Sequence, residues 1–419
     1  MATAGDVAAR GSWGFGGICA LFQKQAALSR VLIDMTFATL KRSLRLQMAR
    51  FLRTLGSGAV LRTIFALAFV LPVAACGQRT STLPDRASEA PAVTEEAVHF
   101  ASGKITLAGT LVLPVGPGPH PAVVLFHGSG PQERDMFMAR WFAEQGAAAL
   151  AYDKRGVGES SGDFRAVPFM ELCDDGLAGI EYLKSRKEIN EKRIGVWGLS
   201  QGGWLGPLAA SRSSAVSFVI AVSGPGVSPG EQMIVYYANE LRAEGVAEND
   251  VREANTLRRD IWHYLSGGTH SDAEYEKAKA ELEKARAKRW YIKVKAQQDD
   301  LFGSLQTPAE LSKPQHRNVN WYQHEMNYDP VATLRAVRQP ALFLFGDKDQ
   351  LIPVAESVAA IRRVLAEDKN HDFAIREFPN DDHGMRLTTS ESYGEIDPEY
   401  LKTMREWLAA HLQNAPGSP

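Results

Sequence analysis

The sequence predicts an α/β protein with a mainly parallel, doubly wound sheet and a helical insertion. From about residue 97 onward, short apolar runs alternate with amphipathic stretches of helical spacing. Several of the runs are apolar throughout, which is typical of strands covered by helices on both faces. Such alternation favours parallel strands joined by helical crossovers, and ligands of these folds bind at the carboxyl ends of the strands.

Length and composition narrow the class of protein before any motif is considered. With 419 residues, 45% of them hydrophobic, the chain can bury a large core. Net charge is near zero and no block of Lys and Arg stands out, so we expect a small-molecule substrate and no nucleic-acid partner. Cys19, Cys76 and Cys173 give neither a disulfide framework nor zinc spacing. We therefore expect no metal and no cofactor.

Residues 48–76 have the layout of a signal peptide. Arg50, Arg53 and Arg62 precede an apolar run over 64–75, as in the basic and apolar regions of such a segment. The run is shorter than the roughly 20 residues that span a bilayer as a helix. A transmembrane anchor is therefore not expected.

The end of this segment, Val73-Ala74-Ala75-Cys76, resembles the lipobox of bacterial lipoproteins. The resemblance implies cleavage before Cys76, lipidation of that cysteine and a lipid anchor in the cell envelope, on an extracytoplasmic face. The alternative is an ordinary secretory signal in which Cys76 is incidental and the protein is secreted. Both interpretations take the mature chain out of the cytoplasm.

The segments on either side of the signal are expected to carry no fold. A signal that began at Met1 would be unusually long, so residues 1–47 are interpreted as unstructured or as the result of a start assigned too early, with translation beginning at Met48 or Met35. Residues 77–96 are small, polar and contain Pro. We expect them to form a disordered tether.

The first part of the expected core covers residues 97–225. The expected strands are 105–115, 121–126, 147–152, 193–197 and 216–222, and the expected helices are 139–145, 169–185 and 201–211. Cys173 falls on the apolar side of the second helix, which predicts a buried small side chain rather than a reactive thiol.

A segment without clear strands, 226–332, follows the first part. Within it, residues 272–289 have an amphipathic helical pattern with Glu281 and Lys284 paired at i,i+3 on the polar side. Because it interrupts the core, we expect this helical insertion to form a cap over the site. The alternative is a plain solvated helix. The core resumes over 333–413, with strands 341–345 and 373–378 and a final helix 398–412.

Ser200 is the candidate nucleophile. It lies in Gly198-Leu199-Ser200-Gln201-Gly202, between an expected strand and an expected helix, which is the context of a nucleophile elbow. Side chains at the two glycines would clash with neighbouring backbone, so the turn exposes the serine hydroxyl. The alternative is that Ser200 serves only as the N-cap of the helix.

His127-Gly128-Ser129-Gly130 follows strand 121–126 directly. A loop of this kind supplies one backbone N–H of an oxyanion hole, and the residue after the nucleophile supplies the other. We expect the donors to be the backbone amides of Ser129 and Gln201. His127 is expected to hold the loop by a hydrogen bond rather than to act as a base.

Asp349 and His383 are expected to complete a catalytic triad with Ser200. Asp349 lies in the loop after strand 341–345, and His383 lies in a polar loop after the last strand. Asp347 is the alternative acid, but its place next to the strand end suggests bonds to backbone amides. The chain order nucleophile, acid, base is characteristic of α/β-hydrolases.

Together the motifs resemble those of bacterial α/β-hydrolase esterases, over about residues 97–412. The matching stretches are HGSGP (127–131), the acidic-Arg-Asp stretch Glu133-Arg134-Asp135, YDKRGVGES (152–160) and GLSQGG (198–203). Dienelactone-hydrolase-like and peptidase-like proteins share them. The resemblance implies the α/β-hydrolase fold and implies that Asp153 and Arg155 hold the loop after their strand. Many relatives have His before the nucleophile and Glu after it, where this chain has Leu199 and Gln201.

We therefore expect a serine hydrolase that cleaves carboxylic esters, with short acyl chains, through a covalent acyl-enzyme. Two alternatives remain: an amidase or peptidase with the same triad, and an inactive lipoprotein that binds a ligand. The expected partners are a small ester and, through Cys76, a membrane. The sequence does not indicate an oligomeric state.

Overall fold

The computed structural model describes residues 93–413, apart from 268–269, 297–299, 314–324, 368–369, 371 and 390–391. The predicted extension 1–47, the signal segment 48–76 with Cys76 and residues 77–92 of the predicted tether lie outside the described residues. Among the helices that are described, none has the length and apolar character needed to cross a membrane.

Eight strands form one sheet in the order β1-β2-β4-β3-β5-β6-β7-β8. They are β1 (Val93–Ser102), β2 (Ile105–Pro114), β3 (His120–Phe126), β4 (Ala148–Tyr152), β5 (Ile189–Leu199), β6 (Val216–Val222), β7 (Ala341–Gly346) and β8 (Phe373–Phe378). β2 pairs antiparallel with β1 and β4, and every other neighbouring pair is parallel. The predicted mainly parallel α/β architecture is confirmed.

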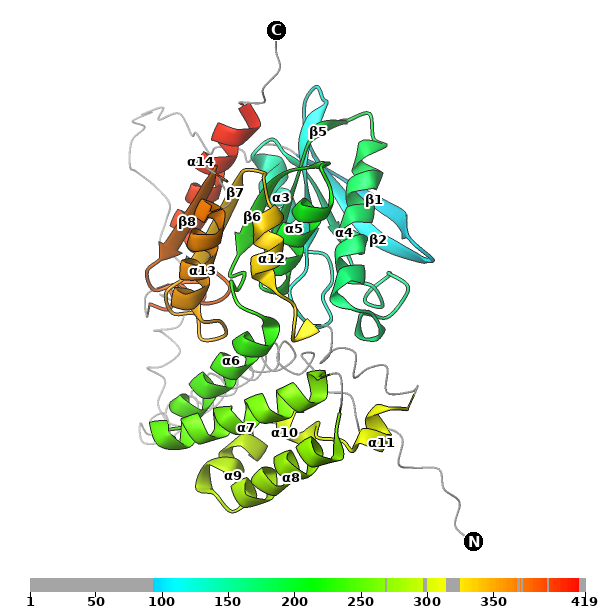
Figure 1. Cartoon of the computed structure of the whole chain (residues 1–419). Helices are drawn as coiled ribbons and strands as arrows, with labels where there is room; N and C mark the ends of the chain where they lie inside the picture. Colours follow the sequence, from blue (N-terminus) through cyan, green and yellow to red (C-terminus); the bar gives the residue numbers. More distant parts are fainter. Residues whose placement is uncertain are drawn as a thin grey trace, which may run out of the picture. The chain divides into compact units, whose positions relative to one another are not determined.

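Helices cover both faces of the sheet (Figure 1). One face carries α3 (Met136–Glu144) and α14 (Pro398–Gln413), and the other carries α4 (Phe169–Lys184), α5 (Gln201–Arg212), α12 (Pro330–Ala336) and α13 (Val354–Glu367). The continuous apolar run of β3 has a simple cause, because Val123 is buried in one core and Val124 in the other. Cys173, on α4, is buried as predicted, and burial raises the pKa of its thiol to about 12.

The predicted boundary of the disordered tether, 77–96, is wrong at its end. Val93 to Glu96 are the first four residues of β1 and pair with β2. The strand lies at the edge of the sheet, and its residues Thr94 to Ala97 are exposed. This part of the sequence therefore has no apolar pattern, and the strand is formed by its backbone hydrogen bonds. Glu95 and Glu96 pair with Arg140 and Arg186.

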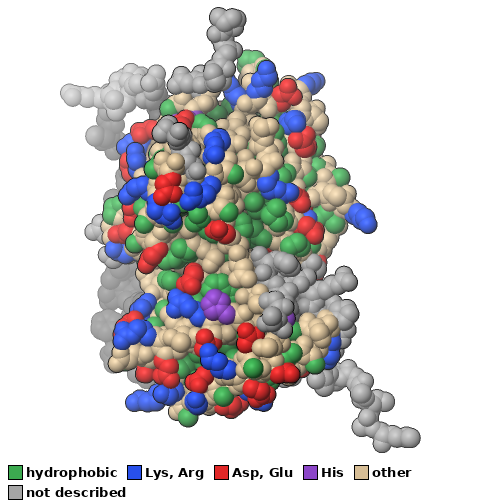
Figure 2. Space-filling model, viewed as in Figure 1, with side chains coloured by type: hydrophobic (Ala, Val, Ile, Leu, Met, Phe, Trp, Pro, Cys, Tyr) green, Lys and Arg blue, Asp and Glu red, His purple; other side chains and the backbone are tan. Residues whose placement is uncertain are grey.

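The described residues of the predicted insertion, 226–332, form helices and short connections. They include α6 (Pro229–Ala243), α7 (Glu248–Ser266), α8 (Asp272–Arg286), α9 (Arg289–Ala296), α10 (Asp300–Gly303) and α11 (Pro308–Leu311). The predicted end at 332 falls inside α12, whose Leu334 is buried in the core of the sheet. These helices have an apolar core of their own, which includes Leu241, Ile261 and Trp290. On α8, Leu282 is buried and Glu281 pairs with Lys284 at 2.6 Å. Acidic and basic side chains are interspersed on the face drawn in Figure 2.

Helix α6 contacts the loop after β7. Gln232 Nε2 donates to the carbonyl oxygen of Leu351 at 2.5 Å, and Asn239 Nδ2 donates to that of Gln350 at 3.0 Å. Because Asp349 belongs to this loop, the helical insertion is hydrogen-bonded next to the candidate acid.

Candidate active site

Ser200 lies between β5 and α5 in a strained backbone conformation, with φ 59° and ψ −114°. Its N–H donates to Val222 O at 2.9 Å. A Cβ on Gly198 would lie 2.2 Å from Gly202 O, and one on Gly202 would lie 2.6 Å from Phe126 O, so only glycine fits at either position. The Ser200 hydroxyl caps none of the α5 amides, which is contrary to the N-cap alternative. Strain of this kind is retained where the turn has a function.

The structure brings His383 and Asp349 into contact. His383 Nδ1 lies 2.7 Å from Asp349 Oδ2, and the Asp349 side chain is fully buried. The second oxygen, Oδ1, accepts the backbone N–H groups of Leu351 at 2.8 Å and Ile352 at 3.2 Å. Because a carboxylate only accepts, Nδ1 carries the proton of the neutral imidazole, which leaves Nε2 as the basic atom.

Two opposing effects act on the pKa of His383. Burial disfavours the imidazolium and lowers the pKa, but the charge and hydrogen bond of Asp349 outweigh it and the net pKa is raised above 6.5. The alternative acid, Asp347, accepts the backbone N–H of Asn380 at 2.7 Å and pairs with Lys348 at 3.0 Å. Its contacts are therefore with backbone and solvent-facing groups, as its place at the strand end suggested.

Two adjacent residues at the end of β6 hold the two halves of the site. Val222 O accepts the N–H of Ser200, and the hydroxyl of Ser223 donates to the carbonyl oxygen of His383 at 2.9 Å. Ser223 has a positive φ of 48°. Sequence reasoning missed Ser223, because a serine after a strand carries no motif of its own.

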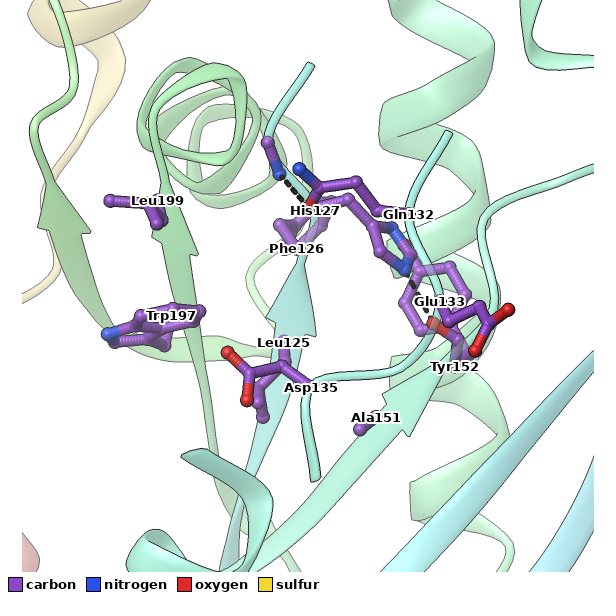
Figure 3. A pocket seen from close by; sticks show the side chains of 11 residues that line it. Leu125, Phe126, His127, Gln132, Glu133, Asp135, Ala151, Tyr152, Trp197 and Leu199 are labelled. Atoms are coloured by element: carbon purple, nitrogen blue, oxygen red, sulfur yellow. Dashed lines mark hydrogen bonds between the residues drawn. The ribbon is translucent and has the colours of Figure 1, made fainter. Parts of the chain in front are cut away.

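The loop after β3 is held by His127 and Gln132 (Figure 3). His127 Nε2 donates to Tyr152 O at 2.5 Å, and its ring packs edge-on against that of Tyr152. Burial, with the charge of Lys154, lowers the pKa of His127 to about 3, so the imidazole is neutral at physiological pH. Gln132 accepts the N–H of Gly128 at 3.2 Å and donates to Ser129 O at 3.3 Å.

Asp153 and Arg155, which follow β4, tie their loop to neighbouring segments. Arg134 donates to both oxygens of Asp153, at 2.9 and 2.5 Å. Arg155 donates to both oxygens of Asp175 on α4, each at 2.7 Å. These contacts have the loop-holding character that the family resemblance implied.

A small pocket lies behind the His127 loop (Figure 3) and encloses about 40 Å³. Its lining includes Leu125, His127, Asp135, Tyr152, Trp197 and Leu199. Neither Ser200 nor His383 lines it. A space of this size holds water rather than an ester.

Comparison with known proteins gives matches throughout the core. The family described as serine aminopeptidase, S33, matches residues 117–374. Esterase EstD of Thermotoga maritima is 32% identical over 162 residues, which span 36% of this chain but only 38% of that protein. An uncharacterized 31.7 kDa protein from the traX-finO intergenic region of Escherichia coli is 31% identical over 266 residues, 63% of this chain and 84% of that one.

Solved structures match over a similar range. Est1E of Butyrivibrio proteoclasticus, solved with ferulic acid bound, is 19% identical with a TM-score of 0.47, covering 76% of this chain and 100% of that one. An acylaminoacyl peptidase of Pyrococcus horikoshii is 17% identical with a TM-score of 0.48, covering 79% of this chain and 44% of that one. Since the family match runs from just before β3 into β8, the chain belongs to the serine aminopeptidase S33 family and has the α/β-hydrolase fold.

Proposed function

We propose that this serine hydrolase cleaves carboxylic esters through a triad of Ser200, His383 and Asp349. The observation that carries the proposal is the 2.7 Å contact of His383 Nδ1 with the buried carboxylate of Asp349, in a molecule whose Ser200 stands at a strained elbow. This contact orients the imidazole and stabilises its cationic form. The esterase activity of EstD agrees with the proposal.

The reaction proceeds in two steps, acylation of Ser200 and hydrolysis of the acyl-enzyme. His383 Nε2 takes the proton of the Ser200 hydroxyl while Oγ attacks the ester carbonyl, and the tetrahedral intermediate expels the alkoxide, which receives that proton from His383. Water then attacks the acyl-enzyme with His383 again as base, and the acid is released as Ser200 regains its proton. Asp349 keeps its hydrogen bond to His383 Nδ1 throughout.

We assign the oxyanion hole to the backbone amides of Ser129 and Gln201. Gln201 is the first residue of α5, where an N–H has no intrahelical acceptor and the helix dipole favours negative charge. Ser129 follows the buried Gly128 in the loop held by Gln132. Each such donor contributes roughly 3 kcal/mol to lowering the barrier.

The helical insertion is the proposed cap. Support comes from α6, whose Gln232 and Asn239 bond to the carbonyls of Leu351 and Gln350, just after Asp349. A helical segment joined to the acid loop is suited to shape the acyl or alcohol side of the cleft. The short-chain preference remains part of the proposal.

The second candidate function is amide or peptide hydrolysis, which the name of the family favours. The same three residues would act, but His383 must protonate a poorer leaving group, an amine. An inactive ligand-binding protein is the third possibility. It predicts no covalent reaction at Ser200.

We also propose export by the segment 48–76 and a lipid anchor on Cys76, in the cell envelope; an ordinary secretory signal, with a secreted product, is the alternative. The sequence Val73-Ala74-Ala75-Cys76 supports this proposal. Expression of the whole chain in a bacterium, followed by detergent partition and mass analysis of the mature N-terminus, tests it. A diacylglycerol adduct on Cys76 is expected; a soluble product cut elsewhere would refute it.

The test of activity uses p-nitrophenyl esters of increasing chain length and the matching anilides. Wild type should hydrolyse the short esters fastest, and Ser200→Ala should lose at least about 10⁴-fold in kcat. Ser211→Ala, at the end of the same helix, is the matched control and should match wild type. A fluorophosphonate should label wild type but not Ser200→Ala. Faster turnover of anilides than of esters would favour the amidase.

A further inference from the structure

Lys154 is a buried cation that the proposed mechanism leaves without a role. It lies two residues after the end of β4 and is only 3% exposed. Taking an ammonium group out of water is costly unless hydrogen bonds compensate for the lost solvation. Its position therefore requires strong local contacts.

The ammonium donates to three oxygens of two separate segments. Nζ lies 2.8 Å from Gly128 O and 3.1 Å from Gly130 O, in the loop after β3. It also lies 2.8 Å from Oε1 of Gln201, the residue after the nucleophile. These segments contain the two amides assigned to the oxyanion hole. A single side chain, that of Lys154, therefore connects the two segments that form the hole.

We propose that Lys154 is the positioning residue of the oxyanion hole, and this inference rests on the proposed function. By holding the Gly128 carbonyl and the Gln201 side chain, its ammonium keeps the amides of Ser129 and Gln201 at a set separation. The residue acts through these backbone groups and does not touch the reacting atoms.

Peptide geometry explains how a bond to a carbonyl orients a donor. The carbonyl of Gly128 and the N–H of Ser129 belong to one planar trans peptide unit, in which the two groups point in opposite directions. Drawing the carbonyl toward Lys154 turns the N–H away from it. A hydrogen bond from a cation also polarises the peptide and makes its N–H a stronger donor.

A second set of hydrogen bonds holds the same loop. The backbone N–H of Lys154 donates to Gln132 O at 3.0 Å, and the Gln132 side chain bonds to Gly128 N and Ser129 O. Backbone and side chain of Lys154 thus both act on the loop of 128–132. The ring of Phe164 lies over the ammonium, 5.2 Å away at its centroid.

The test compares Lys154→Met with wild type on a short p-nitrophenyl ester. Because the oxyanion develops only as Ser200 attacks and is absent from the bound substrate, kcat should fall about 100-fold while KM changes less than about twofold. The inhibition constant of a boronic acid, which mimics the tetrahedral intermediate, should rise by a similar factor. Lys184→Met, a change at a half-buried residue on α4, is the matched control and should retain wild-type kinetics.

Gln201→Met supplies a second test, which leaves the buried ammonium of Lys154 in place. It keeps the backbone amide of residue 201 and removes the Oε1 acceptor, so kcat should fall several-fold with KM unchanged. If the wild type is active and both variants keep its kcat, or change only in a raised KM, the inference about Lys154 is wrong while the proposed function stands. A wild type that neither turns over esters nor reacts with a fluorophosphonate overturns the proposed function, and the inference with it.

Discussion

Ser223 donates its hydroxyl to the carbonyl oxygen of His383 across 2.9 Å. The residue before it, Val222, accepts the backbone N–H of Ser200. The end of β6 therefore holds the chain at both the proposed nucleophile and the proposed base. This strand lies between β5, which leads to Ser200, and β7, which leads to Asp349.

Replacing Ser223 by Ala should slow catalysis without altering substrate binding. The variant leaves the His383 carbonyl without this donor, a loss of about 1 kcal/mol, and loosens the position of the imidazole. We expect kcat to fall about tenfold, in line with that energy and a modest displacement of the base. Steady-state kinetics beside Ser213→Ala, a serine at the far end of α5, provide the check. Equal kcat in both variants would contradict the expectation.

The choice between the two aspartates predicts unequal effects of matched changes. Asp349→Asn should lower kcat about 10⁴-fold, because an amide cannot stabilise the imidazolium or select its tautomer as a carboxylate does. Asp347→Asn should alter kcat by no more than a few-fold, since its contacts are with Asn380 and Lys348. If kcat fell further in Asp347→Asn than in Asp349→Asn, Asp347 would be the acid of the triad and Asp349 would not.

Activity should fall on the acid side as His383 becomes protonated. Only the neutral imidazole accepts the Ser200 proton, and Asp349 outweighs burial to raise the pKa of His383 above 6.5. The kcat/KM of wild type should therefore decline as pH drops through a value above 6.5. In Asp349→Asn the raising influence is gone, so the residual activity should decline at a lower pH. An unchanged profile would show that the titrating group is not this pair.

Asp381 should make the protein less stable as the pH rises toward neutrality. The side chain is fully buried, and among the described residues no N–H or hydroxyl group donates to either carboxyl oxygen. Its polar neighbour is the carboxyl group of Asp397. Burial, followed by the nearby charge of Asp397, raises its pKa from 3.8 to about 7. A raised pKa in the folded state means that the stabilising contribution is complete below about pH 4 and is lost as pH rises through about 7.

The comparison of Asp381→Asn with wild type isolates this contribution. The amide cannot ionise, so the variant should gain stability relative to wild type between pH 4 and 7, by at most about 1.4 kcal/mol per pH unit. Urea unfolding at several pH values measures the difference. Asp174→Asn, on the surface, is the control. A constant difference across the range would mean that Asp381 is ionised throughout.

Much of the fold was predictable because its signals are local. Strand β6 and strand β8 have the predicted bounds, and the expected helix at 169–185 corresponds to α4 within one residue. Strand β1 escaped prediction, since an edge strand with exposed side chains is made by its ladder with β2 and not by an apolar pattern. Helices α12 and α13 also lie outside the predicted elements. α12 has only seven residues, which is too short for a clear helical period. α13 does bury Val358, Ile361 and Leu365 at helical spacing, a local signal that could have found it.

The sequence by itself determined the strand-to-helix turn at Ser200, because glycines and a serine at fixed spacing specify backbone geometry within a few residues. It also indicated candidate carboxylates and histidines by their places after strands. Only the tertiary structure decided that Asp349 rather than Asp347 lies beside His383, and that Lys154 joins the loops of Gly128 and Gln201. Such contacts join residues 26 to 47 positions apart. They depend on strand order and loop paths, which no local pattern encodes.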